Sequence, residues 1–238
     1  SQVDSSIGGK TGINTIQGKN LIGTFYQPKL VISDIQFLKS LPRREVICGY
    51  GEILKHSIIK NKTFFNYLNK YVLKILSLKP PFIKKAILES CKIKKYIVEK
   101  DEKEIGLRKI LNFGHTFAHS YEATLGYSKK LNHGEAVILG IKTALKFSLH
   151  KNYLKKNEYN IIVNHIRKIK ASYNIKRYFS LKDLNKILFF MTKDKKNKSE
   201  KINLILLNKI GSKVFSKQFD KKNLKTFFKK ELTNNYLN

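Results

Sequence analysis

The sequence predicts a mainly α-helical fold. Apolar residues recur at spacings of three and four through most of the 238-residue chain, which is the period of a helix with one buried face. One segment near residues 202–216 alternates instead, as the strands of a β-hairpin do. With 42% hydrophobic residues, 13 glycines and four prolines, the chain can form a large core and is neither collagen-like nor disordered.

The first 35 residues predict loops and short extended segments. Residues 1–20 are rich in Gly, Ser and Asn, which favours loop with at most a short helix. Residues 21–34 carry β-branched and aromatic side chains on both sides of Pro28. We therefore expect short β segments near residues 20–35, interrupted at the proline.

The rest of the chain predicts a succession of helices and one hairpin. Ser40 is expected to cap the first helix, with Pro42 near its first turn. Pro80-Pro81 and Asn132-His133-Gly134 mark breaks, and Gly211 marks the turn of the hairpin. We expect helices over residues 40–61, 64–76, 81–99, 112–125, 134–150, 158–169 and 181–191, and a final polar helix from residue 220 onward.

The net charge of +31 raises the question of nucleic-acid binding. Only five of the 48 basic residues are arginines, the residues that dedicated nucleic-acid binders favour, and the lysines are spread over the whole chain. Abundant Lys, Ile, Asn and Phe indicate an A/T-rich genome, so the composition favours mutational bias over nucleic-acid binding. Two cysteines, no signal-peptide pattern and no apolar run near 20 residues predict a cytoplasmic protein without a membrane span.

Three histidines and one glutamate are candidate metal ligands. His115 and His119 are four residues apart, so a helix would present both on one face, but Thr116 stands where a zincin motif needs glutamate. His133 opens another helix, and Glu52 lies in a helix beside small residues. Glu52 with two of the three histidines would form an open zinc site. The alternatives are a solvated Glu52–Lys55 surface pair and histidines that only form hydrogen bonds.

The GGKTG segment indicates an anion-binding turn. A phosphate-binding loop of the G-x-x-x-x-G-K-[ST] type would require glycine at the position of Asp4, so that motif is excluded. A glycine-rich turn with Lys10 and Lys19 nearby can still bind a phosphate through backbone N–H groups and ammonium charge. The alternative is an ordinary loop on a lysine-rich protein.

Six segments, taken together, resemble the dehydroquinate synthase family in order and spacing. The resemblance runs from the first residue to about Gly211. The segments are VDSSIGGKTGIN, GKNLIGTFYQP, LPRREVICGYGEILKH, DEKEIGLRKILNFGHTFAHSYEATLGY, LNHGEAVILGI and DKKNKSEKINLILLNKIG.

The resemblance implies functional roles at specific positions. A divalent metal, usually Zn²⁺ with Co²⁺ possible, would be held by Glu52, His115 and His133, while His119 would face the substrate. Substrate groups would be Lys55, Lys94, Arg108, Asn112 and one of Lys195 or Lys196. The NAD and substrate cleft would include Asp4, Lys10, Lys19, Phe37, Leu38, Lys39 and Ser40.

The implied activity is the NAD- and metal-dependent conversion of 3-deoxy-D-arabino-heptulosonate 7-phosphate to 3-dehydroquinate and phosphate, a lyase step of the shikimate pathway. The resemblance also implies a homodimer. Residues 1–40 would be the end of an N-terminal α/β nucleotide-binding domain, and residues 41–238 the helical metal- and substrate-binding domain. Because family members carry more of the α/β domain ahead of VDSS, we expect this chain to be a fragment that alone binds NAD weakly and has little activity.

Three other functions are weighed against this one. Another sugar-phosphate cyclase on the same scaffold would not need Lys94, Arg108, Asn112 and His119, which the resemblance assigns to a carboxylate-bearing substrate. A metal-dependent polyol dehydrogenase would not need the Lys/Arg set. A nucleic-acid-binding protein would show affinity that falls steeply with salt, and it leaves the Glu52, His115 and His133 set unexplained.

Overall fold

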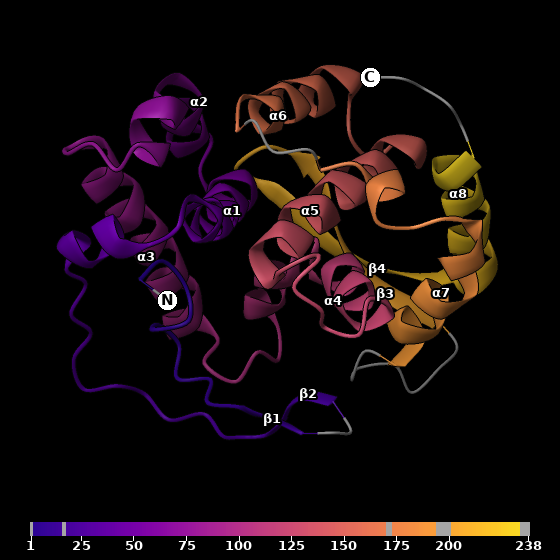
Figure 1. Ribbon diagram of the computed structural model, residues 1–238, viewed down its shortest axis with the longest axis horizontal. Coiled ribbons are helices and arrows are strands. Elements are labelled where there is room, and N and C mark those ends of the chain that lie inside the picture. Colours follow the sequence, from indigo (N-terminus) through magenta and orange to yellow (C-terminus); the bar gives the residue numbers. More distant parts are fainter. Residues whose placement is uncertain (1, 16–17, 170–172, 194–200, 234–238) are drawn as a thin grey trace.

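Helices form most of this computed structural model, which describes residues 2–15, 18–169, 173–193 and 201–233 (Figure 1). The helices are α1 (Arg43–Lys60), α2 (Lys62–Leu76), α3 (Phe82–Lys100), α4 (His115–Thr124), α5 (His133–His150), α6 (Lys156–Lys168), α7 (Leu184–Lys193) and α8 (Lys221–Thr233). The strands are β1 (Ile13–Thr15), β2 (Gly18–Ile22), β3 (Lys201–Lys209) and β4 (Lys213–Asp220). Short 3-10 helices are η1 (Ile35–Ser40), η2 (Leu107–Asn112), η3 (Ile175–Arg177) and η4 (Leu181–Asp183). The expected mainly helical fold is confirmed.

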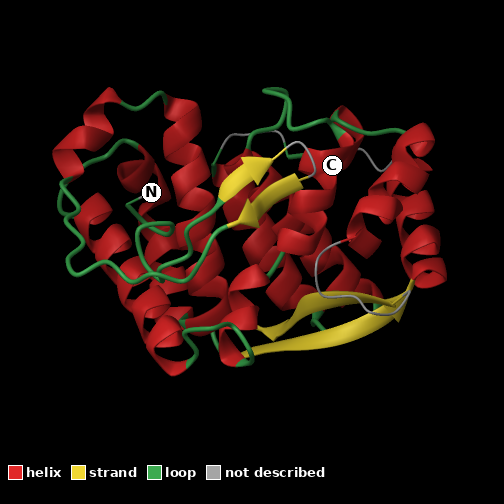
Figure 2. Cartoon of the chain, turned by 90° about the horizontal axis from the view of Figure 1, so that it is seen from below, coloured by secondary structure: helices red, strands yellow, loops and turns green. Residues whose placement is uncertain are grey.

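The strands form two separate antiparallel hairpins, which Figure 2 shows as two-stranded ribbons on the helical body. The hairpin expected near residues 202–216 is β3–β4, in which Leu204 pairs with Lys217 and Leu206 with Phe215. Residues 204–207 of β3 are all buried, and β3 contacts α5, α7 and η2 in addition to its partner strand. This burial on both faces explains the apolar run in that part of the sequence.

Helix α5 lies at the centre of the core, against α1 and α4. It is buried along most of its length, which agrees with a helix that is apolar on nearly all sides. Glycine allows close approach at its contacts. A Cβ on Gly140 would lie 2.3 Å from the carbonyl oxygen of Gly114, and one on Gly51 of α1 would lie 2.8 Å from Ile138 of α5. Gly51, the residue before Glu52, therefore accommodates α5.

Two local expectations differ from the structure. Ser40 does not cap α1: it ends η1, its hydroxyl donates to the carbonyl of Phe37, and α1 begins after Pro42 without a side-chain cap. The strands expected near residues 20–35 lie earlier, at β1 and β2, and residues 26–34 contain no strand. In that stretch Leu30 and Ile32 are 74% and 82% exposed, so no neighbouring strand or helix of the described chain covers them.

None of the described helices is both long enough and apolar enough to cross a membrane.

The division of the chain into a domain of residues 1–40 and a domain of residues 41–238 stays a prediction.

Candidate metal centre

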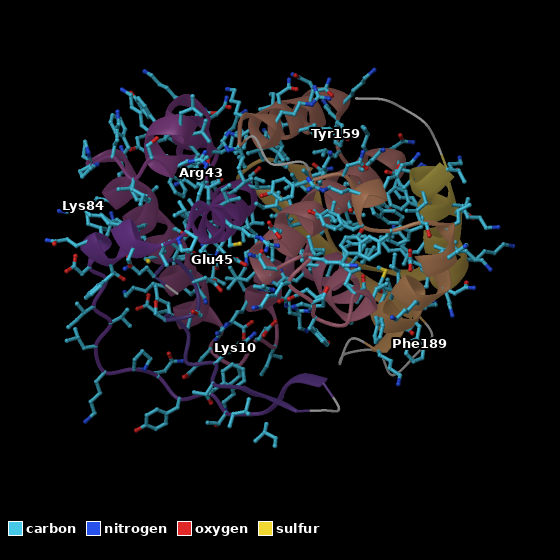
Figure 3. The ribbon with its side chains drawn as sticks, viewed as in Figure 1. Lys10, Arg43, Glu45, Lys84, Tyr159 and Phe189 are labelled. Carbon is cyan, nitrogen blue, oxygen red and sulfur yellow. The ribbon has the colours of Figure 1, made fainter. Side chains whose placement is uncertain are left out.

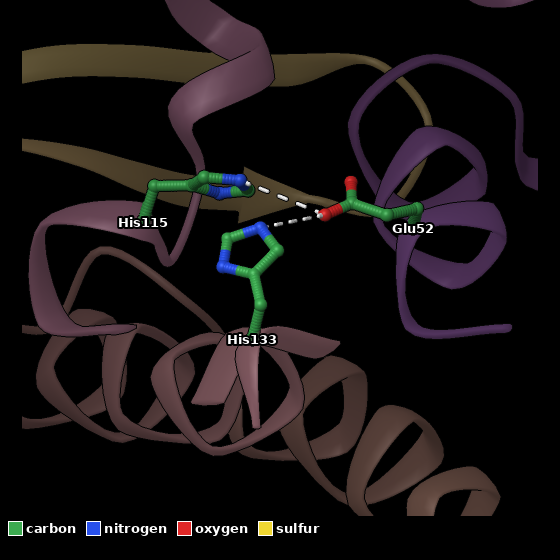
Figure 4. Close-up of side chains that lie close together, drawn as sticks. All are labelled: Glu52, His115 and His133. Carbon is green, nitrogen blue, oxygen red and sulfur yellow. Dashed lines mark ion pairs between the residues drawn. The ribbon is translucent and has the colours of Figure 1, made fainter. Parts of the chain in front are cut away.

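Glu52, His115 and His133 meet at one point, although they lie on three different helices (Figure 4). Glu52 is in the middle of α1, and the two histidines are the first residues of α4 and α5. Oε1 of Glu52 lies 3.6 Å from Nε2 of His115 and 3.9 Å from Nε2 of His133. The structure thus brings together the three residues for which the sequence resemblance implied metal binding.

The donor set fits a divalent metal ion such as zinc. The separations of 3.6 and 3.9 Å exceed hydrogen-bond length, yet both imidazole nitrogens face the same carboxylate oxygen. Ligands bound tetrahedrally at about 2.0–2.1 Å from one ion lie about 3.4 Å from each other, close to these values. Burial, and then the charge of Lys55, lower the pKa of His115 well below its usual range, so this imidazole is neutral, as a metal ligand must be. Three protein ligands leave a position for substrate or water.

The backbone turns place both histidines at helix starts. Gly114, at φ +79°, supplies the left-handed residue just before His115, and a Cβ there would lie 2.7 Å from the backbone nitrogen of Ile141. At the start of α5, Asn132 just before His133 and Glu135 just after it form a reciprocal capping box. Both imidazoles therefore project from helix N-termini toward α1.

Two buried lysines lie beside the carboxylates. Lys55 Nζ is 2.5 Å from Oε2 of Glu52, and Lys55 is 2% exposed, so the interpretation of this pair as a solvated surface contact is wrong. Lys94 Nζ is 2.9 Å from Oδ1 of Asp4. Burial alone would raise the pKa of Asp4, but Lys55, His56 and Lys94 together hold it well below its usual range. The cleft thus combines lysine donors with the ionised carboxylate of Asp4.

Other predicted substrate residues surround this centre. The ring of His119 lies 5.5 Å from that of His115 and 6.2 Å from that of His133, centroid to centroid. Arg108 is buried, and its guanidinium donates to the carbonyls of Gly8 and Glu102. The structure therefore gives this arginine a role in holding the GGKTG loop.

Glu104 is a site residue that the sequence reasoning missed. Its carboxylate accepts a hydrogen bond from the Asn112 amide and forms an ion pair with Lys10, and so joins a predicted substrate residue to a residue predicted for the NAD and substrate cleft. It lies in a turn with φ +59°, and no spacing pattern marks it.

Glu122 was also missed. Its Oε2 lies 3.0 Å from Nδ1 of His133, and Glu122 is buried on α4. Its position one turn after His119 was the available signal, because residues three apart share a helix face.

Only some of the residues expected near NAD line one cavity. Asp4, Phe37 and Leu38 line a cavity of about 640 Å³ that also reaches Glu52 and His133. Lys39 and Ser40 are not among its lining residues, and Lys10 lies instead beside Glu104. Lys19 is in β2. Lys195 and Lys196 lie outside the described residues.

Comparison with known proteins shows the family of this chain. A family model for the C-terminal region of 3-dehydroquinate synthase matches residues 49–197, and one for the N-terminal region matches residues 1–48. The chain belongs to the 3-dehydroquinate synthase family. The 3-dehydroquinate synthase of Pelagibacter ubique is 63% identical over 233 residues, covering 98% of this chain and 63% of the relative. That of Alkaliphilus metalliredigens is 48% identical, covering 86% of this chain and 56% of the relative. The chain thus spans about six tenths of the length of these synthases.

Solved structures share the fold. A 2-epi-5-epi-valiolone synthase from Streptomyces hygroscopicus with NAD⁺ and Zn²⁺ bound superposes with a TM-score of 0.82 at 22% identity, covering 97% of this chain and 63% of that one. A 2-deoxy-scyllo-inosose synthase complexed with carbaglucose-6-phosphate, NAD⁺ and Co²⁺ has the same TM-score at 24% identity. The superposition covers 94% of this chain and 63% of that one. At these identities the likeness establishes the fold of this 3-dehydroquinate synthase family member.

Proposed function

We propose that this chain carries the metal and substrate site of a 3-dehydroquinate synthase, a lyase that converts 3-deoxy-D-arabino-heptulosonate 7-phosphate to 3-dehydroquinate and phosphate. The observation that carries the proposal is the convergence of Glu52, His115 and His133 beside buried Lys55 and Lys94. The family membership and the 63% identical synthase support it. A homodimer and a cytoplasmic location are further parts of the proposal and are supported by the family resemblance.

The metal site would hold Zn²⁺ or Co²⁺, and Asp4, Phe37 and Leu38 would contribute to binding NAD. When bound, the metal supplies a Lewis acid for a substrate hydroxyl or carbonyl, and NAD accepts and returns a hydride. The solved relatives that contain NAD⁺ with Zn²⁺ or Co²⁺ support both cofactors. The carboxylate of Glu52 lies beside the two imidazoles and forms an ion pair with the ammonium group of Lys55.

The cationic residues explain why the substrate would be an acid phosphate. Lys94 and Lys10 each carry an ammonium group, the Asn112 amide is a donor that shares Glu104 with Lys10, and the ring of His119 lies beside those of His115 and His133. Arg108 directs two of its five N–H donors to carbonyls and thereby holds Gly8 of the anion-binding loop. Charge-assisted hydrogen bonds from such groups would select carboxylate and phosphate oxygens.

The metal site is tested by elemental analysis of the purified chain. We expect about one zinc per chain, lost in Glu52→Ala and His133→Ala and kept in Glu99→Ala, a control on the surface of α3 whose partner is Lys95. Wild-type protein without zinc after dialysis against the metal would contradict the proposed site.

The substrate class is tested by calorimetric titration of the zinc-loaded chain with the heptulosonate phosphate. Lys94→Met should abolish the binding heat, because it removes a buried ammonium from the cleft. Lys92→Met is the matched control, since Lys92 lies two residues away on α3 with an exposed side chain paired to Glu89. Phosphate release after addition of NAD then measures turnover. Equal binding by both variants would contradict the assignment of Lys94.

A further inference from the structure

His133 needs support from outside its own helix. It is the first residue of α5, and its side chain is 45% exposed, whereas the side chains of Glu52 and His115 are 9% and 12% exposed. Packing around the imidazole is therefore incomplete. Its position depends on how the start of α5 is fixed relative to α1, the helix that carries Glu52.

Arg44, in the first turn of α1, forms this connection. Its Nε donates to Oε1 of Glu135 at 2.8 Å, and its Nη2 donates to Oε2 at 2.6 Å, a bidentate ion pair. The same Nη2 also reaches the carbonyl oxygens of Lys129 and Lys130, at 2.8 and 3.3 Å. One guanidinium thus holds both the turn before α5 and the first turn of α5 itself.

Neighbouring contacts join the same two segments. Glu45 accepts a hydrogen bond from the Asn132 side chain at 3.2 Å, and the Cys48 thiol donates to Oδ1 of Asn132 at 2.9 Å. Figure 3 shows Arg43 and Glu45 in the first turn of α1. Gly134 lies so close to α1 that a Cβ would be 2.3 Å from the Cα of Cys48. Residues on either side of His133 are therefore fixed to the first two turns of α1.

We propose that Arg44 is a positioning residue for the metal centre. Through Glu135 it fixes the start of α5 against α1, so that His133 faces Glu52 before any ion binds. Arg44 and Glu52 are on one helix, which transmits the placement from its first turn to its middle. This inference rests on the proposed metal site, and it adds a role for a residue eight positions from the nearest ligand.

Zinc affinity of the full chain, measured by competition with a chelating dye, tests the role of Arg44. We expect Arg44→Gln to weaken zinc binding about tenfold or more, as substitutions behind metal ligands do. Glu135→Gln should have a similar effect, and it preserves the capping box because glutamine serves at this position. The double variant should bind zinc no more weakly than the weaker-binding single variant, since the two substitutions remove the same interaction.

Arg43→Gln is the matched control, because Arg43 is the adjacent exposed arginine and takes no part in these contacts with Glu135 and the 129–130 turn. Helical content and thermal unfolding of the metal-free variants separate misfolding from weaker binding, and the Co²⁺ absorption spectrum reports ligand geometry directly. If Arg44→Gln does not fold, Glu135→Gln alone decides the matter. Unchanged zinc affinity and Co²⁺ spectrum in Glu135→Gln would overturn the role of Arg44, whereas a wild type that binds no zinc would overturn the metal site itself and this role with it.

Discussion

Nδ1 of His133 lies 3.0 Å from Oε2 of Glu122, a buried carboxylate on α4. An ionised carboxylate can only accept, so Nδ1 of His133 is the donor in this contact and Nε2, the other ring nitrogen, faces Glu52. Glu122 on α4 thus orients the ring of His133, while contacts with α1 fix the start of α5. The two contacts define ring orientation and backbone position separately.

Glu122→Ala should weaken zinc binding by about 10–100-fold, because the carboxylate behind a ligand histidine fixes the ring and increases its basicity. Glu122→Gln, which retains an amide oxygen toward Nδ1, should have a smaller effect. Dye competition with the purified variants measures both. The same affinity in Glu122→Ala as in the wild type would show that His133 is placed without Glu122.

Two glycine substitutions should have opposite effects on stability. Gly49 is inside α1 and has room for a methyl group, since the nearest atom is 3.8 Å away on Val3, so Gly49→Ala should raise the free energy of unfolding by up to about 1 kcal/mol. Gly134→Ala should lower it by about 1–3 kcal/mol, because its Cβ would overlap the backbone of Cys48. Urea unfolding distinguishes the two. A Gly134→Ala protein as stable as Gly49→Ala would contradict the close contact between α1 and α5.

His165 should make the protein sensitive to acid. It is fully buried, accepts a hydrogen bond from the Tyr50 hydroxyl at Nε2 and lies 3.2 Å from the amide oxygen of Asn69 at Nδ1. Burial, and then the charge of Lys168, lower its pKa to about 4. The unfolded chain takes up a proton here below about pH 6.5 and the folded chain only below about 4, so stability falls as pH decreases through this window.

The expected loss at His165 is about 3 kcal/mol between pH 6.5 and 4. Buried His56 and His115, whose pKa values are also lowered, add to the loss in every variant. Urea unfolding at a series of pH values should therefore give a shallower pH dependence for His165→Gln than for the wild type. Parallel curves for the two proteins would mean that His165 has the same pKa in the folded and unfolded chains.

Arg108→Lys should loosen the GGKTG loop. An ammonium on a flexible stem cannot reproduce the fixed fork that reaches both Gly8 and Glu102, whose carbonyl groups now accept from the guanidinium. The amides of Ile7 and Thr11, which bond to Asp4 and Thr24, should then exchange with deuterium at least severalfold faster. Lys103→Arg, at an exposed position, is the control. Unchanged exchange in Arg108→Lys would exclude this role.

The helices and the β3–β4 hairpin could be predicted from the sequence because each has its own local period of apolar residues. The prediction that Ser40 caps α1 was wrong, because its hydroxyl bonds within the preceding 3-10 turn instead. The strands expected around Pro28 also differ, since a strand forms only where a partner pairs with it, and β1 and β2 pair with each other instead.

The sequence alone determined which side chains could bind a metal and that His115 and His119 share one helix. The resemblance selected His115 and His133, and the tertiary structure brings these two to Glu52 from the starts of α4 and α5. It also decided that Lys55 is buried, that Glu104 contacts Lys10 and Asn112, that Glu122 contacts His133, and that Arg44 contacts Glu135. The contacts of Glu122 with His133, of Arg44 with Glu135 and of Lys10 with Glu104 join residues 11 to 94 positions apart, and tertiary packing sets their distances, so the period of apolar residues along the chain does not contain them.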